Sequence, residues 1–234
     1  MHPLRHRLTA LASVAALATL GFGCSQPDPE PENGEAAEES TAAQSTPGET
    51  VEIDGVENFY GEHGDYVTAI AAINAGDITA EDLEYPFVVQ QDHVDASGST
   101  EPPTYEMSPP AGGNHLSVWQ TCTGSVYDGP VADGNAVHSM EHGAVWLTYD
   151  PELVDAAGVA ALAEQIGDRD YSLMSPYPGQ GVAVSLQSWG NRYQTEDVAD
   201  PNIEAYLDAY ILNPAFNPEP NATCEGGLVT TVEA

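Results

Sequence analysis

The apolar positions of this chain change their spacing several times after residue 60, which predicts alternating helices and strands. The segment from Asp65 to Asn74 has helical spacing, and it is followed by Gly76, a common residue just past a helix end. We therefore expect a short helix there. The side chains that we expect to face the core are Val67, Ile70, Ala71 and Ile73.

Four runs rich in β-branched and aromatic residues predict strands. These runs are Tyr85–Gln90, Ala144–Tyr149, Tyr171–Met174 and Val182–Trp189. Between the first two lies Thr100–Gly113, which is rich in proline and glycine and therefore predicts an irregular loop.

Three further helices complete the pattern. Asn135 and Gly143 have the residue types of an N-cap and a C-terminal stop, and they bracket a two-turn helix. Asp150-Pro151-Glu152 is typical of a helix start and predicts a helix up to Ile166, and Pro201–Leu212 has amphipathic spacing. The expected fold class is α+β, with a small mixed sheet, short helices and Pro/Gly-rich loops in one compact domain.

Composition divides the chain into three parts. Residues 1–24 combine Arg5 and Arg7 with an apolar run, which is typical of an export signal rather than a membrane span. Residues 25–51 have almost no large apolar side chain, so we expect a disordered acidic tether. Residues 52–234 have distributed apolar and aromatic positions and are expected to form a single globular domain.

The residues around Cys24 predict the location of the protein. A cysteine directly after Gly23 resembles the bacterial lipoprotein signal, in which the thiol receives a diacylglyceryl group. This pattern predicts a protein anchored by lipid to the outer face of the cell membrane, with that membrane as its partner. The alternative is a secreted protein that loses Cys24 with its signal.

The charge balance excludes one class of partner. The formal net charge is −33, lysine is absent, and the only cationic side chains after residue 24 are Arg169 and Arg192. Because phosphate binding needs a basic face, we expect no nucleic-acid partner. A surface this acidic repels itself unless salt screens it, so we expect a salt-adapted, halophilic source.

The cysteines predict one disulfide. Removal or lipidation of Cys24 leaves the pair Cys122 and Cys224 in a chain that we expect to be exported to an oxidising compartment. We expect these two to be bridged, and the loop-entropy model assigns such a bridge about 4–5 kcal/mol. Two buried thiols are the alternative.

The clearest candidate chemistry lies between residues 135 and 149. His138, Glu141 and His142 stand at positions i, i+3 and i+4, which share one face of a helix. Helices present divalent metal ligands in this way. The spacing His-x-x-Glu-His is also the inverted form of a zinc-peptidase motif, in which the glutamate acts as general base.

Several segments between Phe87 and Gly227 resemble, in order, the family catalogued as domain of unknown function 3105. The segments that carry the resemblance are Asp92–Val94, Pro109–His115, Val118–Cys122, Asn135–Tyr149, Ser175–Gly179, Ser188–Gly190, and Pro218–Pro220 followed by Cys224. Members of that family are mostly exported or membrane-anchored proteins of actinobacteria, so the resemblance implies export. It implies no reaction, because none is assigned to the family. Thr123-Gly124-Ser125 departs from the pattern by lengthening the link after Cys122.

Four of the five histidines after residue 24 lie in these segments. We therefore predict a metal site whose ligands are His93, His115, His138, His142 and Glu141. Nitrogen and oxygen ligands suit zinc, and copper is a competitor to which Met140 or Met107 could add a soft donor. Met140 lies off the helix face that His138 and His142 share, which makes it the weaker candidate.

Three functions stay open at this point. The first is a metal-binding surface lipoprotein, with an unknown protein partner. The second is a small zinc hydrolase that uses Glu141 as its base, although the sequence favours no enzyme and predicts no other catalytic residue. The third is a structural or interaction module whose histidines hold the fold by hydrogen bonds and pack against Trp119 and Trp146.

Overall fold

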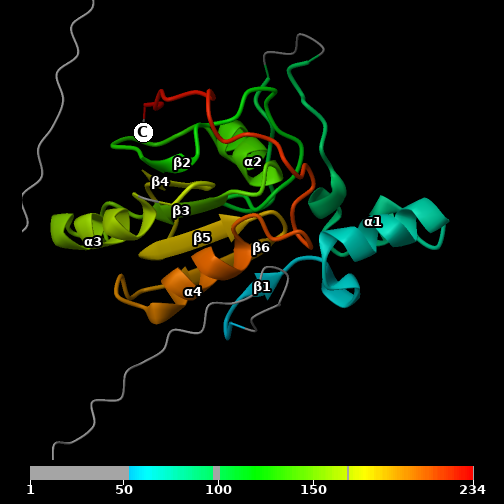
Figure 1. Cartoon of the computed structure of the whole chain (residues 1–234), viewed down its shortest axis with the longest axis horizontal. Helices are drawn as coiled ribbons and strands as arrows, with labels where there is room; N and C mark the ends of the chain where they lie inside the picture. The colour runs from blue at the N-terminus through cyan, green and yellow to red at the C-terminus, as the bar shows by residue number, and fades with distance from the viewer. Residues whose placement is uncertain (1–52, 97–100, 168, 234) are drawn as a thin grey trace, which may run out of the picture. The chain divides into compact units, whose positions relative to one another are not determined.

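A six-stranded mixed sheet forms the centre of the computed structural model (Figure 1). The structure describes residues 53–96, 101–167 and 169–233. The strands are β1 (Glu57–Asn58), β2 (Thr123–Val126), β3 (Val145–Tyr149), β4 (Ser172–Pro176), β5 (Val184–Ser188) and β6 (Asn191–Thr195), and their order across the sheet is β1-β6-β5-β3-β4-β2.

Parallel and antiparallel pairing occupy different parts of the sheet. Strands β1, β6, β5 and β3 pair antiparallel, whereas β4 pairs parallel to both β3 and β2. A parallel pair needs a crossover connection, and helix α3 supplies the one between β3 and β4. The β5–β6 connection is the short turn Trp189-Gly190, where Gly190 has φ of 72°. These features confirm the predicted α+β class.

In the part of the chain that the structure describes, four α-helices and three 3-10 helices accompany the sheet. They are α1 (Tyr66–Ala75), α2 (Asp133–Glu141), α3 (Ala156–Ile166), α4 (Pro201–Tyr210), η1 (Gly61–His63), η2 (Ala80–Asp82) and η3 (Pro86–Val89).

Both faces of the sheet are covered, because successive residues of its central strand belong to different hydrophobic clusters. Trp146 of β3 packs in the cluster that contains Met140 of α2. The next residue, Leu147, packs in the cluster that contains Leu162 of α3 and Leu207 of α4. Side chains of a strand alternate between faces, so α2 covers one face, and α3 and α4 cover the other.

The prediction of a strand over residues 85–90 was wrong. Residues Pro86–Val89 form the 3-10 helix η3, and Val88 is buried within it. Pro86 stands at the start of η3, where its missing N–H costs nothing and its fixed φ suits a helix. Val88 therefore packs into the core as part of a helical turn. Tertiary packing overrides the strand propensity of this β-branched run.

The predicted start of the third α-helix was also wrong. Helix α3 begins at Ala156, and its N-cap is Asp155, whose side chain accepts from the Gly158 N–H. The carboxylate of Asp150 accepts from the backbone N–H groups of Glu152 and Gly179. Asp150 therefore stabilises a turn that precedes the helix.

The inward face predicted for the first helix was only partly right. The bounds are close, because α1 is capped by Asp65 and ends before Gly76. However, its buried residue is Ala69, whereas Val67 is 53% exposed and Ala71 is also exposed. The packed face runs through Tyr66, Ala69 and Ile73, a helical i, i+3, i+7 stripe.

Cys122 and Cys224 form the predicted disulfide, with a Cα–Cα distance of 4.9 Å. The segment after Cys122 becomes β2, an edge strand that was not predicted. Its register with β4 shifts between Thr123 and Ser125, so the intervening Gly124, with φ of 71°, is accommodated as a bulge. The bulge absorbs the longer link seen in the sequence.

The predicted signal and tether, residues 1–24 and 25–51, lie outside the described residues, and so does the lipidation residue Cys24. Among the helices that the structure does describe, none combines the length and the apolar character needed to cross a bilayer.

Candidate metal centre

Helix α2 is buried along almost its whole length although its sequence is polar. Every residue from Gly134 to Glu141 is buried. Burying polar side chains is costly unless they are hydrogen-bonded, and several side chains of α2 bond to the chain before Cys122. Asn135 donates to the Val118 carbonyl, and Ser139 donates to the Gln120 carbonyl. Polar side chains therefore fix α2 against the segment that precedes Cys122.

The bounds of α2 correct one prediction and support another. Its N-cap is Ala132, and Asn135 lies inside the helix because its amide is used for the Val118 contact. At the other end, Gly143 follows the C-cap His142 with φ of 96°, as expected for a residue that stops a helix.

Two loops bring His93 and His115 next to this helix. Their backbones form an isolated parallel bridge, in which Val94 N–H donates to the His115 carbonyl at 2.9 Å. The preceding Gly112 and Gly113 have φ of 135° and 108°, so they take a backbone conformation that favours glycine. The second loop then follows α2, with Leu116 N–H donating to the Gly134 carbonyl.

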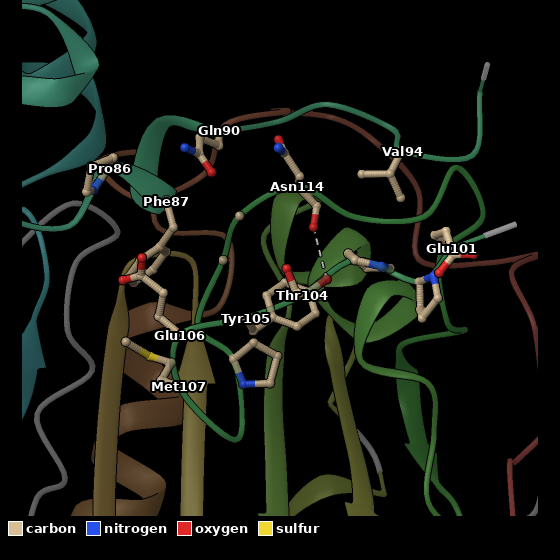
Figure 2. A pocket seen from close by; sticks show the side chains of 15 residues that line it. Pro86, Phe87, Gln90, Val94, Glu101, Thr104, Tyr105, Glu106, Met107 and Asn114 are labelled. Carbon is tan, nitrogen blue, oxygen red and sulfur yellow. Dashed lines mark hydrogen bonds between the residues drawn. The ribbon is translucent and has the colours of Figure 1, made fainter. Parts of the chain in front are cut away.

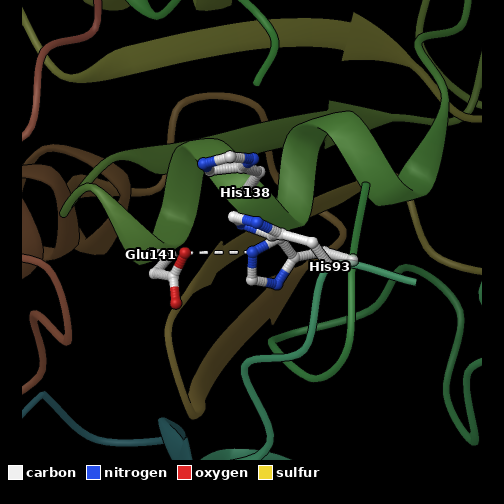
Figure 3. Close-up of side chains that lie close together, drawn as sticks. His93, His138 and Glu141 are labelled. Atoms are coloured by element: carbon white, nitrogen blue, oxygen red, sulfur yellow. Dashed lines mark ion pairs between the residues drawn. The ribbon is translucent and has the colours of Figure 1, made fainter. Parts of the chain in front are cut away.

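The structure gathers four of the five predicted ligands into one group, and the fifth, His142, lies in a second group that shares His138. His93, His115, His138 and Glu141 each offer a ligand atom, and these four atoms lie within 4.8 Å of one another. The rings of the three histidines form a triangle with centroids 4.8 to 4.9 Å apart. Figure 3 shows His93 and His138 facing each other beside the carboxylate of Glu141. His93 is exposed, whereas the other three residues are buried.

Glu219, a residue that the sequence did not predict as a ligand, belongs to a second group. His138, His142 and Glu219 also place their ligand atoms within 4.8 Å of one another. Glu219 Oε2 is 3.4 Å from His142 Nε2, and its side chain is 57% exposed. The C-terminal segment lies against the end of α2, since Glu219 N–H donates to the Glu141 carbonyl. The only sequence signal was its place between two prolines in a family-like segment.

Main-chain carbonyls fix the tautomer of the three buried histidines. The Nδ1 atoms of His115, His138 and His142 lie 2.7 to 2.9 Å from the carbonyls of Gly113, Leu116 and Thr223, respectively. A carbonyl only accepts, so each Nδ1 carries a hydrogen and donates it. In a neutral ring the Nε2 atom is then bare and presents a lone pair. The same arrangement orients histidine ligands in known metal sites.

Burial keeps two of these rings neutral. Desolvation lowers the pKa of His138 to about 4, against a smaller opposing effect of its hydrogen bond to Leu116. Desolvation also lowers the pKa of His142, again against its hydrogen bond to Thr223. Both imidazoles are therefore neutral at pH 7, and their Nε2 lone pairs are available to a cation.

The contact between His115 and Glu141 is not satisfied by hydrogen bonding. His115 Nε2 is 2.9 Å from Glu141 Oε2, and the side chains are 0% and 8% exposed. Nevertheless, Nε2 has no hydrogen-bond partner, because the contact lacks hydrogen-bond geometry and the ring hydrogen is on Nδ1. If the ring is neutral, its bare nitrogen and the carboxylate oxygen repel at this distance unless a cation, either a proton or a metal ion, lies between them.

The donor set fits a transition-metal ion. Donors bound to one zinc ion at about 2.0–2.1 Å lie roughly 3.3 Å apart in a tetrahedron, so modest side-chain shifts would close the four-atom group. The predicted soft donor Met140 is fully buried in the hydrophobic core, and Met107 packs at the edge of that core. Both groups therefore consist of nitrogen and oxygen donors.

One of the two tryptophans predicted to pack on the histidines does so. Trp119 has its ring centroid 4.9 Å from that of His142 and 5.7 Å from that of His138. Trp146 instead donates from Nε1 to Ser175 and packs against Tyr177. Trp119 therefore forms a wall of the cluster on the His142 side.

A cavity of about 550 Å³ is lined by residues of η3 and of the segment from Glu101 to Asn114 (Figure 2). Proline, aromatic and amide side chains line it, including Phe87, Gln90 and Tyr105. Its lining extends to Val94 and Asn114, the neighbours of His93 and His115 in the chain, and none of the clustered histidines lines it. The cavity and the cluster are therefore separate features.

These observations define a class of protein: a small α+β domain with one disulfide that buries a histidine and carboxylate cluster between a helix and two loops. The chain belongs to the family described as "Protein of unknown function (DUF3105)", whose model matches residues 93–226. The match includes all six clustered residues, and it confirms the resemblance seen in the sequence. No curated protein and no solved structure matches the chain.

Proposed function

We propose that this domain binds a divalent transition-metal ion through the cluster on α2 and its two neighbouring loops. The observation that carries the proposal is the unpartnered, fully buried Nε2 of His115 beside the Glu141 carboxylate. Hydrogen bonds account for the Nδ1 atoms of the buried histidines, but this Nε2 atom has no hydrogen-bond partner among the described residues. A bound cation supplies the missing partner.

Zinc(II) is the ion that the donors favour. The buried donors are imidazole nitrogens and carboxylate oxygens, which zinc(II) accepts in four-coordinate sites. Copper(II) accepts the same donors in a more planar arrangement and is the competitor. Copper(I) prefers thiolate and thioether ligands, and it is disfavoured because Met140 is committed to the core.

Hydrolase activity has less support than binding. Glu141, the candidate general base, contributes to the first ligand group and lies within 2.9 Å of His115 Nε2. A base must instead be free to take a proton from metal-bound water. The lining of the cavity in Figure 2 includes none of the clustered histidines, so this cavity does not place a substrate at an ion bound by the cluster.

We also propose that the domain is held by lipid at the outer face of the cell membrane. The support is the signal-like pattern that ends at Cys24, together with a disulfide between Cys122 and Cys224, a bond typical of exported proteins. Replacing Cys24 by serine is expected to move the protein from the membrane fraction to the medium. Retention of the Cys24→Ser variant in washed membranes would contradict the lipid anchor.

Metal content tests the proposed function directly. The oxidised protein, stripped with a chelator and reloaded separately with zinc(II), copper(II) and manganese(II), is expected to retain one zinc or copper ion per chain after gel filtration. Cobalt(II) as a spectroscopic substitute is expected to give the intense visible bands of tetrahedral nitrogen and oxygen coordination, without a sulfur charge-transfer band. Folded protein that retains none of these ions would make the histidines structural.

A further inference from the structure

The two ligand groups of the cluster share His138, and they cannot both use it at once. Its Nδ1 donates to the Leu116 carbonyl at 2.7 Å, so Nε2 is its single free lone pair. A bridging imidazolate would require loss of the Nδ1 hydrogen and of that bond. One ion at a time can therefore bind His138, either with His93, His115 and Glu141 or with His142 and Glu219. We call these the inner set and the outer set.

The two sets differ in what surrounds them. In the inner set the carboxylate is that of Glu141, 8% exposed at its side chain beside His115 at 0%, and the exposed donor is the imidazole of His93. In the outer set, His142 is 4% exposed at its side chain and Glu219 is 57% exposed. The ring centroids of His138 and His142 are 4.6 Å apart, which is a short step for an ion that stays bound to His138.

Glu219 is held in place for this role although it is exposed. Its N–H donates to the Glu141 carbonyl, which joins the inner and outer carboxylates through the backbone. The disulfide at Cys224 and the bond from His142 Nδ1 to the Thr223 carbonyl hold the same segment against α2. An anchored carboxylate at the surface attracts a cation and can replace buried ligands one at a time.

We propose that the cluster gives one ion two alternative positions, with His138 bound in both, and that the ion exchanges with its surroundings through Glu219. This inference rests on the proposed function and deepens it, because an ion with such an exit is cargo that the domain passes on. In the exchange, the ion keeps its bond to His138 Nε2, releases Glu141 and the other inner ligands, and gains His142 Nε2 and a Glu219 oxygen. The transfer needs no deprotonation of His138 or His142, since the Nε2 atoms of both neutral rings are already bare.

Release kinetics of the zinc-loaded protein test this proposal. Glu219→Gln keeps the size of the side chain but offers a weaker ligand, and Glu225→Gln is the matched control, an exposed carboxylate in the same segment. With excess chelator, zinc release from Glu219→Gln is expected to be about tenfold slower than from the parent. Its equilibrium affinity is expected to stay within about threefold of the parent, because the inner set is intact, and the control should match the parent in both.

A second variant checks that the outer set acts as a unit. His142→Asn preserves a donor for the Thr223 carbonyl but removes the Nε2 ligand, so it should also slow release. The double variant should be no slower than either single variant, since both interrupt the same step. Release from Glu219→Gln at the parent rate, or two zinc ions per chain in the parent, would overturn the inference while leaving metal binding established. A parent that binds no zinc would overturn the proposed function itself.

Discussion

Replacing His138 by asparagine is expected to abolish high-affinity metal binding while leaving the domain folded. The amide nitrogen of asparagine is as many bonds from Cβ as Nδ1 of histidine, so it can still donate to the Leu116 carbonyl. The Nε2 ligand common to both sets is lost. Because removal of even a supporting partner costs 10–100-fold in affinity, we expect the zinc affinity to fall by more than about 100-fold.

The measurement is a competition titration of parent and variant with zinc(II) against a chromogenic chelator, beside a circular dichroism thermal scan. His63→Asn is the matched control, the same change in η1, outside both ligand groups. It should bind as the parent does. If His138→Asn binds zinc with the parent's affinity, His138 is not a ligand, and neither set describes the site.

Removal of the disulfide is expected to cause the largest loss of stability. Cys122 and Cys224 are 102 positions apart, and a closed loop of that length is worth about 4–5 kcal/mol in the chain-entropy model. The Cys122→Ala, Cys224→Ala double variant should therefore lose about 4 kcal/mol of unfolding free energy, a large part of the stability of an ordinary domain. Urea unfolding followed by fluorescence measures this loss.

Reduction of the parent protein provides the control for that prediction. Parent protein with a thiol reductant should unfold at the same urea concentration as the double variant. The reductant should not change the urea concentration at which the double variant unfolds. The metal affinity should fall too, because Glu219 and the Thr223 carbonyl lie in the segment that the disulfide at Cys224 attaches to the domain. A double variant as stable as the oxidised parent would show that packing alone holds this segment.

Local spacing was sufficient to predict the helix that carries the site. His138, Glu141 and His142 were placed on one face by the 3.6-residue period, and the structure puts all three in the cluster. The N-cap was not predictable in this way, because the side chain of Asn135 bonds to Val118, a residue whose position depends on the tertiary fold. Capping preferences describe local competition, which a tertiary contact can override.

We predicted that His93 and His115 join the site only because both lie in family-like segments. No local pattern indicated that they approach this helix. Their approach depends on the backbone bridge between the two loops and on two glycines with positive φ, and neither feature has a periodic signature. Glu219 was missed for the same reason. It is a single acidic residue in a chain of net charge −33, and its position is set by a backbone bond to Glu141.

The strands that escaped prediction lie toward the edges of the sheet. Strand β6 has the sequence Asn-Arg-Tyr-Gln-Thr, in which Tyr193 is the one large aromatic or apolar side chain, and β1 is two residues long. Outer strands bury less surface, so their residues need little hydrophobic alternation. The central strands β3, β4 and β5 are buried throughout, and their apolar runs were found.

The disulfide separates the candidate metal ligands into residues inside and residues outside the covalent ring that it closes. His138, Glu141, His142 and Glu219 all belong to the ring that Cys122 and Cys224 close, whereas His93 and His115 precede it. A protease that cut the chain between His115 and Cys122 would leave the outer set on one covalently closed piece. The fragment with His93 and His115 would then be retained only by non-covalent contacts. If the cluster binds metal as proposed, a single nick would therefore weaken the inner set, whereas the ring would keep the residues of the outer set together.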